Sequence, residues 1–306
     1  MQRPAKPFTP VRFRLQPPNE LKENMKIGII GFGFVGKALS NGINDDVEQF
    51  KVDPKLNTKV EDLINFNPEL VFISVPTPMN DDGTQDISIL MEVFKKLNEH
   101  SHKFLIVIKS TILPSSLNEI SKINNNFILN PEFLREKHAN EDFINSSTII
   151  FGGDATISEK VSKFYIQHTK CLNQNHIFTD VISASLIKYS INSFLATKVI
   201  FFNELNQIFK NSGSSDSWKN FINAISTDKR VGNSHMDVPG HDSRMGFGGP
   251  CFPKDTRALH QYSKEVGSEF KLLLKATQIN NSIRSEYNDV TDREKEQNIN
   301  FKSKGE

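Results

Sequence analysis

A glycine-rich turn, Gly31-Phe-Gly-Phe-Val-Gly36, constrains the fold more than any other feature of the sequence. It follows the apolar run 26–30, which predicts a β-strand, and it leads into the helical stretch 35–41. In that context, a GxGxxG turn indicates a dinucleotide-binding unit. Gly31 allows the tight turn, Gly33 lets a pyrophosphate approach backbone N–H groups at the helix N-terminus, and Gly36 permits close packing of helix on strand.

A carboxylate stands where the ribose of such a dinucleotide would lie. Asp53 comes 22 residues after Gly31, at the end of the next apolar run, and can accept hydrogen bonds from a ribose hydroxyl. Its negative charge repels a 2′-phosphate, so we expect NAD rather than NADP. The alternative is a glycine-rich turn in an unrelated α/β domain. The expected cofactor-binding residues here are Gly31, Phe32, Gly33, Phe34, Val35, Gly36 and Asp53.

Apolar runs alternate with helical stretches through the first half of the chain. This alternation predicts an α/β fold with a Rossmann-type, doubly wound parallel sheet. Residues 183–210 contain no Pro or Gly and space apolar side chains at helical intervals, which predicts one helix of roughly 40 Å. We expect it to connect two domains or to pack against a second subunit. The six apolar runs are 26–30, 47–52, 70–75, 104–108, 127–129 and 148–151.

The 306 residues are enough for two domains with tails. Five prolines before residue 25 predict a disordered extension, and translation from Met25 is as plausible as from Met1. We expect a helix to begin near Asp255 and another to run through about 270–290. The expected parts are an extension (1–24), an NAD-binding Rossmann domain (25–182), a central helix with an all-helical dimerisation/substrate domain (183–290) and a frayed polar tail (291–306).

Composition excludes several classes of protein. Thirty-seven Lys and Arg balance 36 Asp and Glu, so no global field attracts nucleic acid or an anionic membrane. No apolar run reaches the roughly 20 residues of a membrane span, and no signal peptide is evident, so we expect a soluble cytoplasmic protein. Cys171 and Cys251 lie too far apart for a CxxC site, and the eight histidines show no ligand spacing. We expect no metal.

Several segments together resemble the UDP-glucose/GDP-mannose 6-dehydrogenase family, over about 25–290. The resemblance implies oxidation of C6 of a nucleotide sugar to a carboxylate, most of all UDP-glucose to UDP-glucuronate, by two NAD and without metal. It also implies a homodimer built around the long helix. The segments are Ser74-Val-Pro-Thr-Pro78, Lys109-Ser-Thr111, Asn130-Pro-Glu-Phe-Leu-Arg-Glu136, Lys188-x-x-x-Asn192, Asp228-Lys-Arg-Val-Gly232 and Gly246-Phe-Gly-Gly-Pro-Cys-Phe-Pro-Lys-Asp255.

The chemistry of a four-electron oxidation at one carbon agrees with this resemblance. An aldehyde intermediate can be held on a thiol as a thiohemiacetal until the second hydride leaves. Cys251 lies between a glycine loop, which we expect to be flexible, and a Pro-Lys-Asp turn that starts a helix, where a thiolate is stabilised. We expect Cys171 to be a buried small apolar residue.

Lys188 and Asn192 are four residues apart, so they share a helical face and can converge on one oxygen. The resemblance implies that they stabilise an oxyanion with Asp255, and that Glu132 is the acid/base for thioester hydrolysis with Thr111 near the same water. Taken alone, such residues are typical of a solvated surface. The implied catalytic residues are therefore Cys251, Lys188, Asn192, Glu132, Asp255 and Thr111.

The resemblance also assigns the remaining site residues. Glu136 would line the nicotinamide side, and Arg230 would reach the substrate across a dimer interface. Further cofactor contacts would come from Ser74, Val75, Pro76, Thr77, Ser110 and Glu136. The implied substrate contacts are Phe133, Leu134, Arg135, Arg230, Phe247, Gly248, Gly249 and Lys254.

Members of the family normally continue into another nucleotide-binding domain, and here only a polar tail follows. This leaves open whether the chain works in a compact form or is completed by a separate polypeptide. Two other functions also stay open. One is a 3-hydroxyacid or 6-phosphogluconate type dehydrogenase, which performs one oxidation and needs no cysteine, and the other is a non-catalytic, truncated NAD-binding remnant.

Overall fold

The structure is a computed structural model that describes residues 24–80, 82–101, 103–287 and 289–302. The expected disordered extension therefore lies, except for Asn24, outside the described residues. Seven strands form one sheet in the order β2-β1-β3-β4-β5-β6-β7. They are β1 (Lys26–Ile30), β2 (Glu48–Val52), β3 (Leu70–Ile73), β4 (Leu105–Ile108), β5 (Phe127–Leu129), β6 (Ile150–Gly152) and β7 (Ile177–Thr179).

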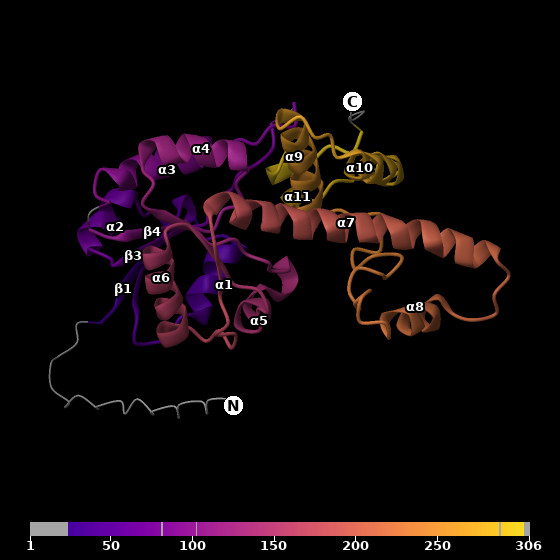
Figure 1. Cartoon of the computed structure of the whole chain (residues 1–306), viewed down its shortest axis with the longest axis horizontal. Coiled ribbons are helices and arrows are strands. Elements are labelled where there is room, and N and C mark those ends of the chain that lie inside the picture. The colour runs from indigo at the N-terminus through magenta and orange to yellow at the C-terminus, as the bar shows by residue number, and fades with distance from the viewer. Residues whose placement is uncertain (1–23, 81, 102, 288, 303–306) are drawn as a thin grey trace, which may run out of the picture.

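Helices cover both faces of this sheet (Figure 1). Alternate strand residues face opposite sides, so Ile29 and Phe72 enter one apolar core while Ile30 and Ile73 enter the other. Helices α1, α5 and α6 close the first core, and α2, α3 and α4 close the second. Their bounds are α1 (Phe34–Gly42), α2 (Val60–Phe66), α3 (Ser88–Asn98), α4 (Pro114–Ile123), α5 (Ala139–Ile144) and α6 (Ala155–His168), with short 3-10 turns at Pro54–Leu56 and Glu136–His138.

The doubly wound sheet is confirmed, with one departure from the parallel pattern. Strand β6 pairs antiparallel to β5 through Leu129 and Gly152, and then parallel to β7. The sequence did not indicate β7, because Ile177 and Phe178 are about half exposed and the strand is only three residues long. Strands β1 to β5 all run parallel to one another, so the carboxyl ends of β1, β3, β4 and β5 meet at one edge.

The predicted long helix is confirmed as α7 (Val181–Asn211). The Asp180 side chain caps its start by accepting a hydrogen bond from the Ser183 N–H, and Gly213, at φ +74°, lies just past its end. The helix runs away from the sheet, and α9 and α10 pack along it while α8 lies beside its far end (Figure 1). The helical part comprises α8 (Trp218–Ser226), α9 (Phe252–Glu265), α10 (Lys271–Arg284) and α11 (Asp292–Glu296).

Two expectations for the C-terminal region are wrong, the end of the second helix and the frayed tail. Helix α10 ends at Arg284 rather than near 290, whereas α9 begins at Phe252, three residues before Asp255 and so near the expected start. The tail is not frayed over 291–302, because Thr291 and Glu294 form a capping box that starts α11, and Ile299 and Phe301 are buried. None of the helices in the described ranges combines the length and apolar character needed to cross a membrane.

Candidate active site

The glycine turn lies at the carboxyl end of β1, where the strand order reverses between β1 and β3. Gly31 has φ +87°, and a Cβ there would lie 2.6 Å from the Ser74 carbonyl oxygen. A Cβ on Gly36 would lie 2.1 Å from the Gly31 carbonyl oxygen. A Cβ on Gly33, by contrast, would have no atom within 4 Å. The backbone is therefore open at the start of α1, which fits a dinucleotide pyrophosphate.

Asp53 is held beside this turn by backbone donors. Its Oδ2 accepts a hydrogen bond from the Phe32 N–H at 2.8 Å, and its Oδ1 accepts one from the Lys55 N–H at 2.9 Å. An ionised carboxylate has about four acceptor positions, so two are left for ribose hydroxyls. Asp53 is partly exposed, which leaves those positions accessible. The free acceptor positions therefore fit the hydroxyl groups of the NAD ribose.

Hydroxyl groups tie the loops after β3 and β4 to the turn. Ser74 Oγ donates to the Gly31 carbonyl at 2.7 Å, and Ser110 Oγ donates to the Val75 carbonyl at 2.7 Å. Thr77 Oγ1 is buried and donates to the Thr111 carbonyl at 2.8 Å. Within this expected cofactor wall, Pro76 is exposed. The three hydroxyls thus fix the shape of the wall.

A buried ion pair joins α7 to the segment after β5. Lys188 Nζ donates to Glu132 Oε1 at 3.0 Å and to the Glu132 carbonyl at 2.5 Å. The other carboxylate oxygen, Oε2, accepts a hydrogen bond from the Leu134 N–H at 2.6 Å. Burial alone would lower the pKa of Lys188, but the negative charges of Glu132 and Asp255 outweigh it and raise that pKa. The lysine is therefore a cation in the site.

A second buried group joins α7 to α9. Asn192 Nδ2 donates to Asp255 Oδ2 at 2.6 Å, and Lys254 Nζ donates to Asp255 Oδ1 at 2.5 Å. Asp255 has no exposed surface. Lys188 and Asn192 share a face of α7, as expected, but each binds a different carboxylate rather than one common oxygen. The cause is that Glu132 and Asp255 approach that face from two separate segments.

Cys251 caps α9 and is partly accessible. Burial of its thiol, reinforced by the charges of Glu132 and Asp255, raises its pKa to about 12 despite the ammonium groups of Lys188 and Lys254. The expectation of a stabilised thiolate is therefore wrong for this state, because desolvation and two carboxylates outweigh the helix N-terminus. The same interactions bring Cys251 into one cluster with Glu132, Asp255, Lys188 and Lys254.

The loop before Cys251 is held in place, contrary to the expectation that it is flexible. Its Phe247 N–H donates to Asn280 Oδ1 at 2.6 Å, and its Gly249 N–H donates to Glu294 Oε1 at 2.8 Å. The Phe247 side chain is buried between α7 and α10. Two of the backbone donors expected to close on the substrate are thus already used. Sequence reasoning missed Asn280 and Glu294, although Thr291 and Glu294 form the Thr-x-x-Glu pattern of a capping box in the sequence.

Three expected contacts have other partners. Arg135 donates to both carboxylate oxygens of Asp142, at 3.0 and 2.7 Å. Arg230 is paired with Asp228 in its own turn, and its side chain is 89% exposed. Glu136 is paired with Arg293 of α11 at 2.8 Å. Phe133 does lie at the cluster, with its ring centroid 5.3 Å from Lys188 Nζ.

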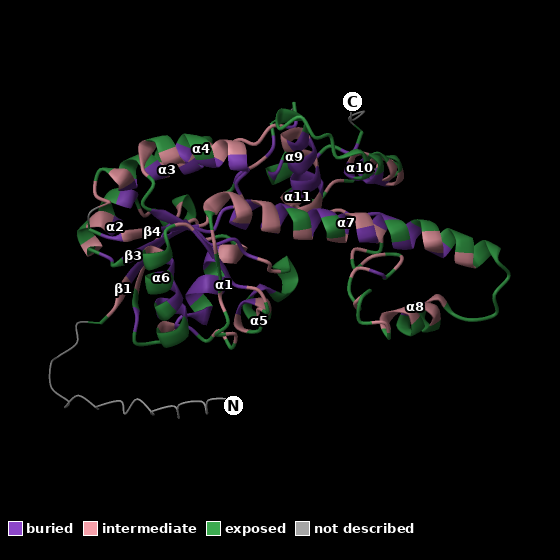
Figure 2. Cartoon of the chain, viewed as in Figure 1, coloured by how far each residue is buried: buried purple, intermediate pink, exposed green. Residues whose placement is uncertain are grey.

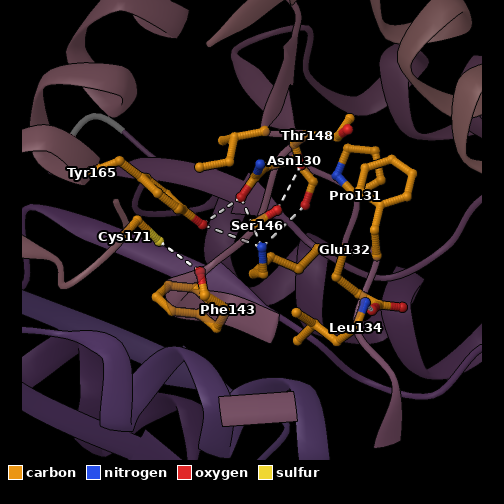
Figure 3. Close-up of a pocket in the computed structure, with 12 residues that line it drawn as sticks. Asn130, Pro131, Glu132, Leu134, Phe143, Ser146, Thr148, Tyr165 and Cys171 are labelled. Carbon is orange, nitrogen blue, oxygen red and sulfur yellow. Dashed lines mark hydrogen bonds between the residues drawn. The ribbon is translucent and has the colours of Figure 1, made fainter. Parts of the chain in front are cut away.

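A second polar cluster contacts the Asn130–Leu134 segment, around a small pocket that Glu132 also lines (Figure 3). Lys109 Nζ donates to Asn130 Oδ1 at 2.8 Å and to the Tyr165 hydroxyl at 3.2 Å. Burial lowers the pKa of Lys109 to about 8. Cys171 lines the same pocket and donates from Sγ to the Phe143 carbonyl at 3.0 Å.

Two sequence profiles of one family match the chain. Residues 46–169 match the NAD binding domain of the UDP-glucose/GDP-mannose dehydrogenase family, and residues 182–282 match its central domain. UDP-glucose 6-dehydrogenase of Rickettsia bellii is 39% identical over 215 residues, which are 68% of this chain and 48% of the relative. The Rickettsia typhi enzyme is 32% identical over 291 residues, covering 81% and 65%. The chain therefore spans about half to two thirds of these relatives.

Solved structures share the fold. A UDP-glucose dehydrogenase from Pyrobaculum islandicum superposes with a TM-score of 0.68 at 24% identity, covering 87% of this chain and 70% of the other. The 3-hydroxyisobutyrate dehydrogenase of Mycobacterium tuberculosis superposes with a TM-score of 0.65 at 16% identity, covering 88% and 96%. The fold is therefore shared by both classes of dehydrogenase, whereas the sequence profiles match only the nucleotide-sugar class. The family resemblance of the motifs is confirmed, and the chain belongs to the UDP-glucose/GDP-mannose dehydrogenase family, whose NAD-binding domain it contains.

Proposed function

We propose that this chain oxidises C6 of a nucleotide sugar, UDP-glucose to UDP-glucuronate, in two NAD-dependent steps through a covalent bond to Cys251. The observation that carries the proposal is the cluster of one thiol with two lysines and two carboxylates, in which Lys188 pairs with Glu132 and Asn192 with Asp255. A single oxidation of a hydroxy acid needs no thiol. The names of the relatives support the substrate class.

The residues of the turn would hold the cofactor. The open backbone at Gly33 would receive the pyrophosphate, and Asp53 would bind the ribose, while the wall from Ser74 to Thr77, with Ser110 and Glu136, would line the nicotinamide side. When bound, the nicotinamide supplies a hydride acceptor for each of the two oxidations. Asp53 gives the selectivity, because its carboxylate repels a 2′-phosphate.

Cys251 would retain the aldehyde formed by the first oxidation. Its Sγ bonds to C6 as the carbonyl π electrons move to oxygen, and the thiol proton ends on that oxygen, giving a thiohemiacetal. A thiol with a pKa of about 12 carries that proton into the step. Lys188 has three N–H donors, of which two bind Glu132, so the third can hold the developing oxyanion, and Asn192 supplies an amide N–H.

Glu132 would act in the hydrolysis of the thioester left by the second oxidation. It takes a proton from water while the water oxygen bonds to C6, and it gives that proton to Cys251 Sγ as the C–S bond breaks, which restores the thiol. Lys188 orients this carboxylate through the ion pair. Asp255 positions Asn192, and Thr111, in the loop after β4, would lie near the attacking water.

Phe133, Leu134 and Lys254 are proposed as substrate neighbours because each contacts Lys188, Glu132 or Asp255. Arg135 and Phe247 would serve as supports, because one is paired with Asp142 and the other is buried. Gly248 would offer the backbone of the loop to the substrate.

The far part of α7 supports a dimer. Phe194, Phe201 and Ile208 are 60 to 65% exposed on this helix, and Figure 2 shows the exposed stretches along its length. Large exposed apolar side chains on one helix favour burial against a second copy. Arg230 pairs with Asp228 and does not contact the cluster around Cys251 in its own chain, so it would bind the substrate of the second copy. Sedimentation of the isolated chain tests this, and a monomer at micromolar concentration would exclude it.

The proposed reaction is tested by counting NADH. Incubation with UDP-glucose and excess NAD is expected to give two NADH per sugar and a carboxylate product. Cys251→Ala is expected to abolish net acid formation and to leave NAD binding intact, because the thiol is far from the pyrophosphate turn in the sequence and plays no part in that turn. One NADH per substrate from a 3-hydroxy acid would instead establish the alternative class. NAD binding without turnover of any UDP or GDP sugar would indicate a non-catalytic protein.

A further inference from the structure

The loop that leads into Cys251 is fixed by side chains from three helices. The Gly246 N–H donates to Asn203 Oδ1 of α7 at 2.9 Å, and the Phe247 N–H donates to Asn280 Oδ1 of α10 at 2.6 Å. The Gly249 N–H donates to Glu294 Oε1 of α11 at 2.8 Å. Glu294 therefore holds the loop at the point nearest to the cysteine, two residues before it.

Glu294 is itself rigid. The residue is only 1% exposed, and its Oε2 accepts hydrogen bonds from the Thr291 N–H and hydroxyl, both at 2.8 Å. A Cβ at position 248 would lie 2.8 Å from both Glu294 Oε1 and Arg284 Nη1. The loop thus passes between a buried carboxylate and a buried guanidinium, and Gly248 is required for that passage.

Helix α11 is anchored on both halves of the molecule. Arg293 pairs with Glu136 and lies 5.8 Å from the centroid of the Phe34 ring, at the start of α1. Beyond the helix, Asn298 Nδ2 donates to the Met79 carbonyl at 3.0 Å, and Phe301 is buried. The segment that carries Glu294 is therefore held against the cofactor domain as well as against the loop.

We propose that Glu294 is a positioning residue, which sets the place of the Cys251 thiol against Glu132 and Asp255 by fixing the Gly249 backbone. The catalytic part of this role rests on the proposed function, whereas the structural part does not. Loss of the carboxylate releases the loop and moves the thiol away from the two carboxylates that suppress its ionisation.

The test uses the full chain with Cys171→Ser as background, so that alkylation by iodoacetamide reports Cys251. The parent rate is expected to rise without a plateau up to pH 10. Glu294→Ala is expected to react at least tenfold faster at pH 8 and to reach its plateau at least one pH unit lower. Glu294→Gln keeps one acceptor oxygen and the side-chain volume, so it is expected to lie between the two. Glu296→Gln, on the exposed side of α11, is the matched control and is expected to follow the parent.

Hydrogen exchange and kinetics complete the test. The Gly249 amide is expected to exchange at least tenfold faster in Glu294→Ala, with the Asp53 turn unchanged. In turnover with UDP-glucose, kcat is expected to fall at least tenfold while KM for NAD stays within twofold. Superimposable alkylation profiles of parent, Glu294→Gln and Glu294→Ala would overturn the proposal. Absence of turnover in the parent would overturn the proposed function alone, because the alkylation and exchange measurements need no substrate.

Discussion

Two buried lysines contact the Asn130–Leu134 segment, in different chemical surroundings. Lys188 faces the cysteine loop and binds the Glu132 carboxylate. Lys109 faces the pocket of Figure 3 and binds Asn130 and the Tyr165 hydroxyl, which are neutral groups. Both are less than 5% exposed. The pKa of Lys188 is raised, and that of Lys109 is lowered to about 8.

The difference shows that a directly bound carboxylate, in addition to burial, sets the pKa of a buried lysine in this molecule. Desolvation lowers the pKa of both ammonium groups and the Glu132 charge raises it for both, but of the two only Lys188 hydrogen-bonds the Glu132 carboxylate and has Asp255 as a further charge that raises its pKa. Burial, reinforced by the same two carboxylates, raises the pKa of Cys251. Lys188 thus belongs to a charged cluster suited to oxyanion chemistry, whereas Lys109 belongs to a buried network whose hydrogen-bond partners are neutral.

The largest expected effect comes from Lys188→Met. This change leaves the Glu132 carboxylate buried without its cation, so we expect a loss of about 3–5 kcal/mol in the free energy of unfolding. The proposed turnover should fall by on the order of 10²–10³, because a donor to the oxyanion is removed. Urea unfolding and NADH release measure the two effects.

The double variant Lys188→Met/Glu132→Gln tests the cause of that loss. A glutamine carries no charge, so most of the lost stability is expected to return while turnover stays low. Equal stability of the single and double variants would show that Lys188 does not stabilise the fold through its ion pair with Glu132.

The Lys109 side is expected to respond to pH. The pKa of Lys109 is about 8 in the folded chain and 10.5 ordinarily, so between these values the unfolded chain holds a proton that the folded chain has lost. Stability of the parent relative to Lys109→Met should therefore rise from pH 8 to 10.5, by up to about 3 kcal/mol, and be flat below pH 8. Lys188 should give no such rise below pH 10.5, because its pKa is raised. Urea unfolding of parent and variant from pH 6 to 10.5 measures this, and a constant difference would contradict it.

The sequence was sufficient to predict the sheet, the long helix and the glycine turn, because each rests on local spacing. It was also sufficient to name Lys188 and Glu132, but not to pair them, since they are 56 residues apart and meet only when α7 packs on the sheet. The thiol pKa depends on charges from three segments, which no local pattern contains. Glu294 was missed for another reason, because the polar composition of 291–306 concealed a capping box whose carboxylate reaches the loop.

The smallest expected effect is that of Cys171→Ala. The thiol is half-buried, lines the Lys109 pocket and donates only to the Phe143 carbonyl among the described residues. Burial raises its pKa, so it is neutral at pH 7 and changes no charge when removed. We therefore expect a loss of about 1 kcal/mol in stability and an unchanged yield of two NADH per sugar. Unfolding and NADH counting beside Cys251→Ala measure the contrast, and a tenfold fall in turnover for Cys171→Ala would show that the two clusters act as one site.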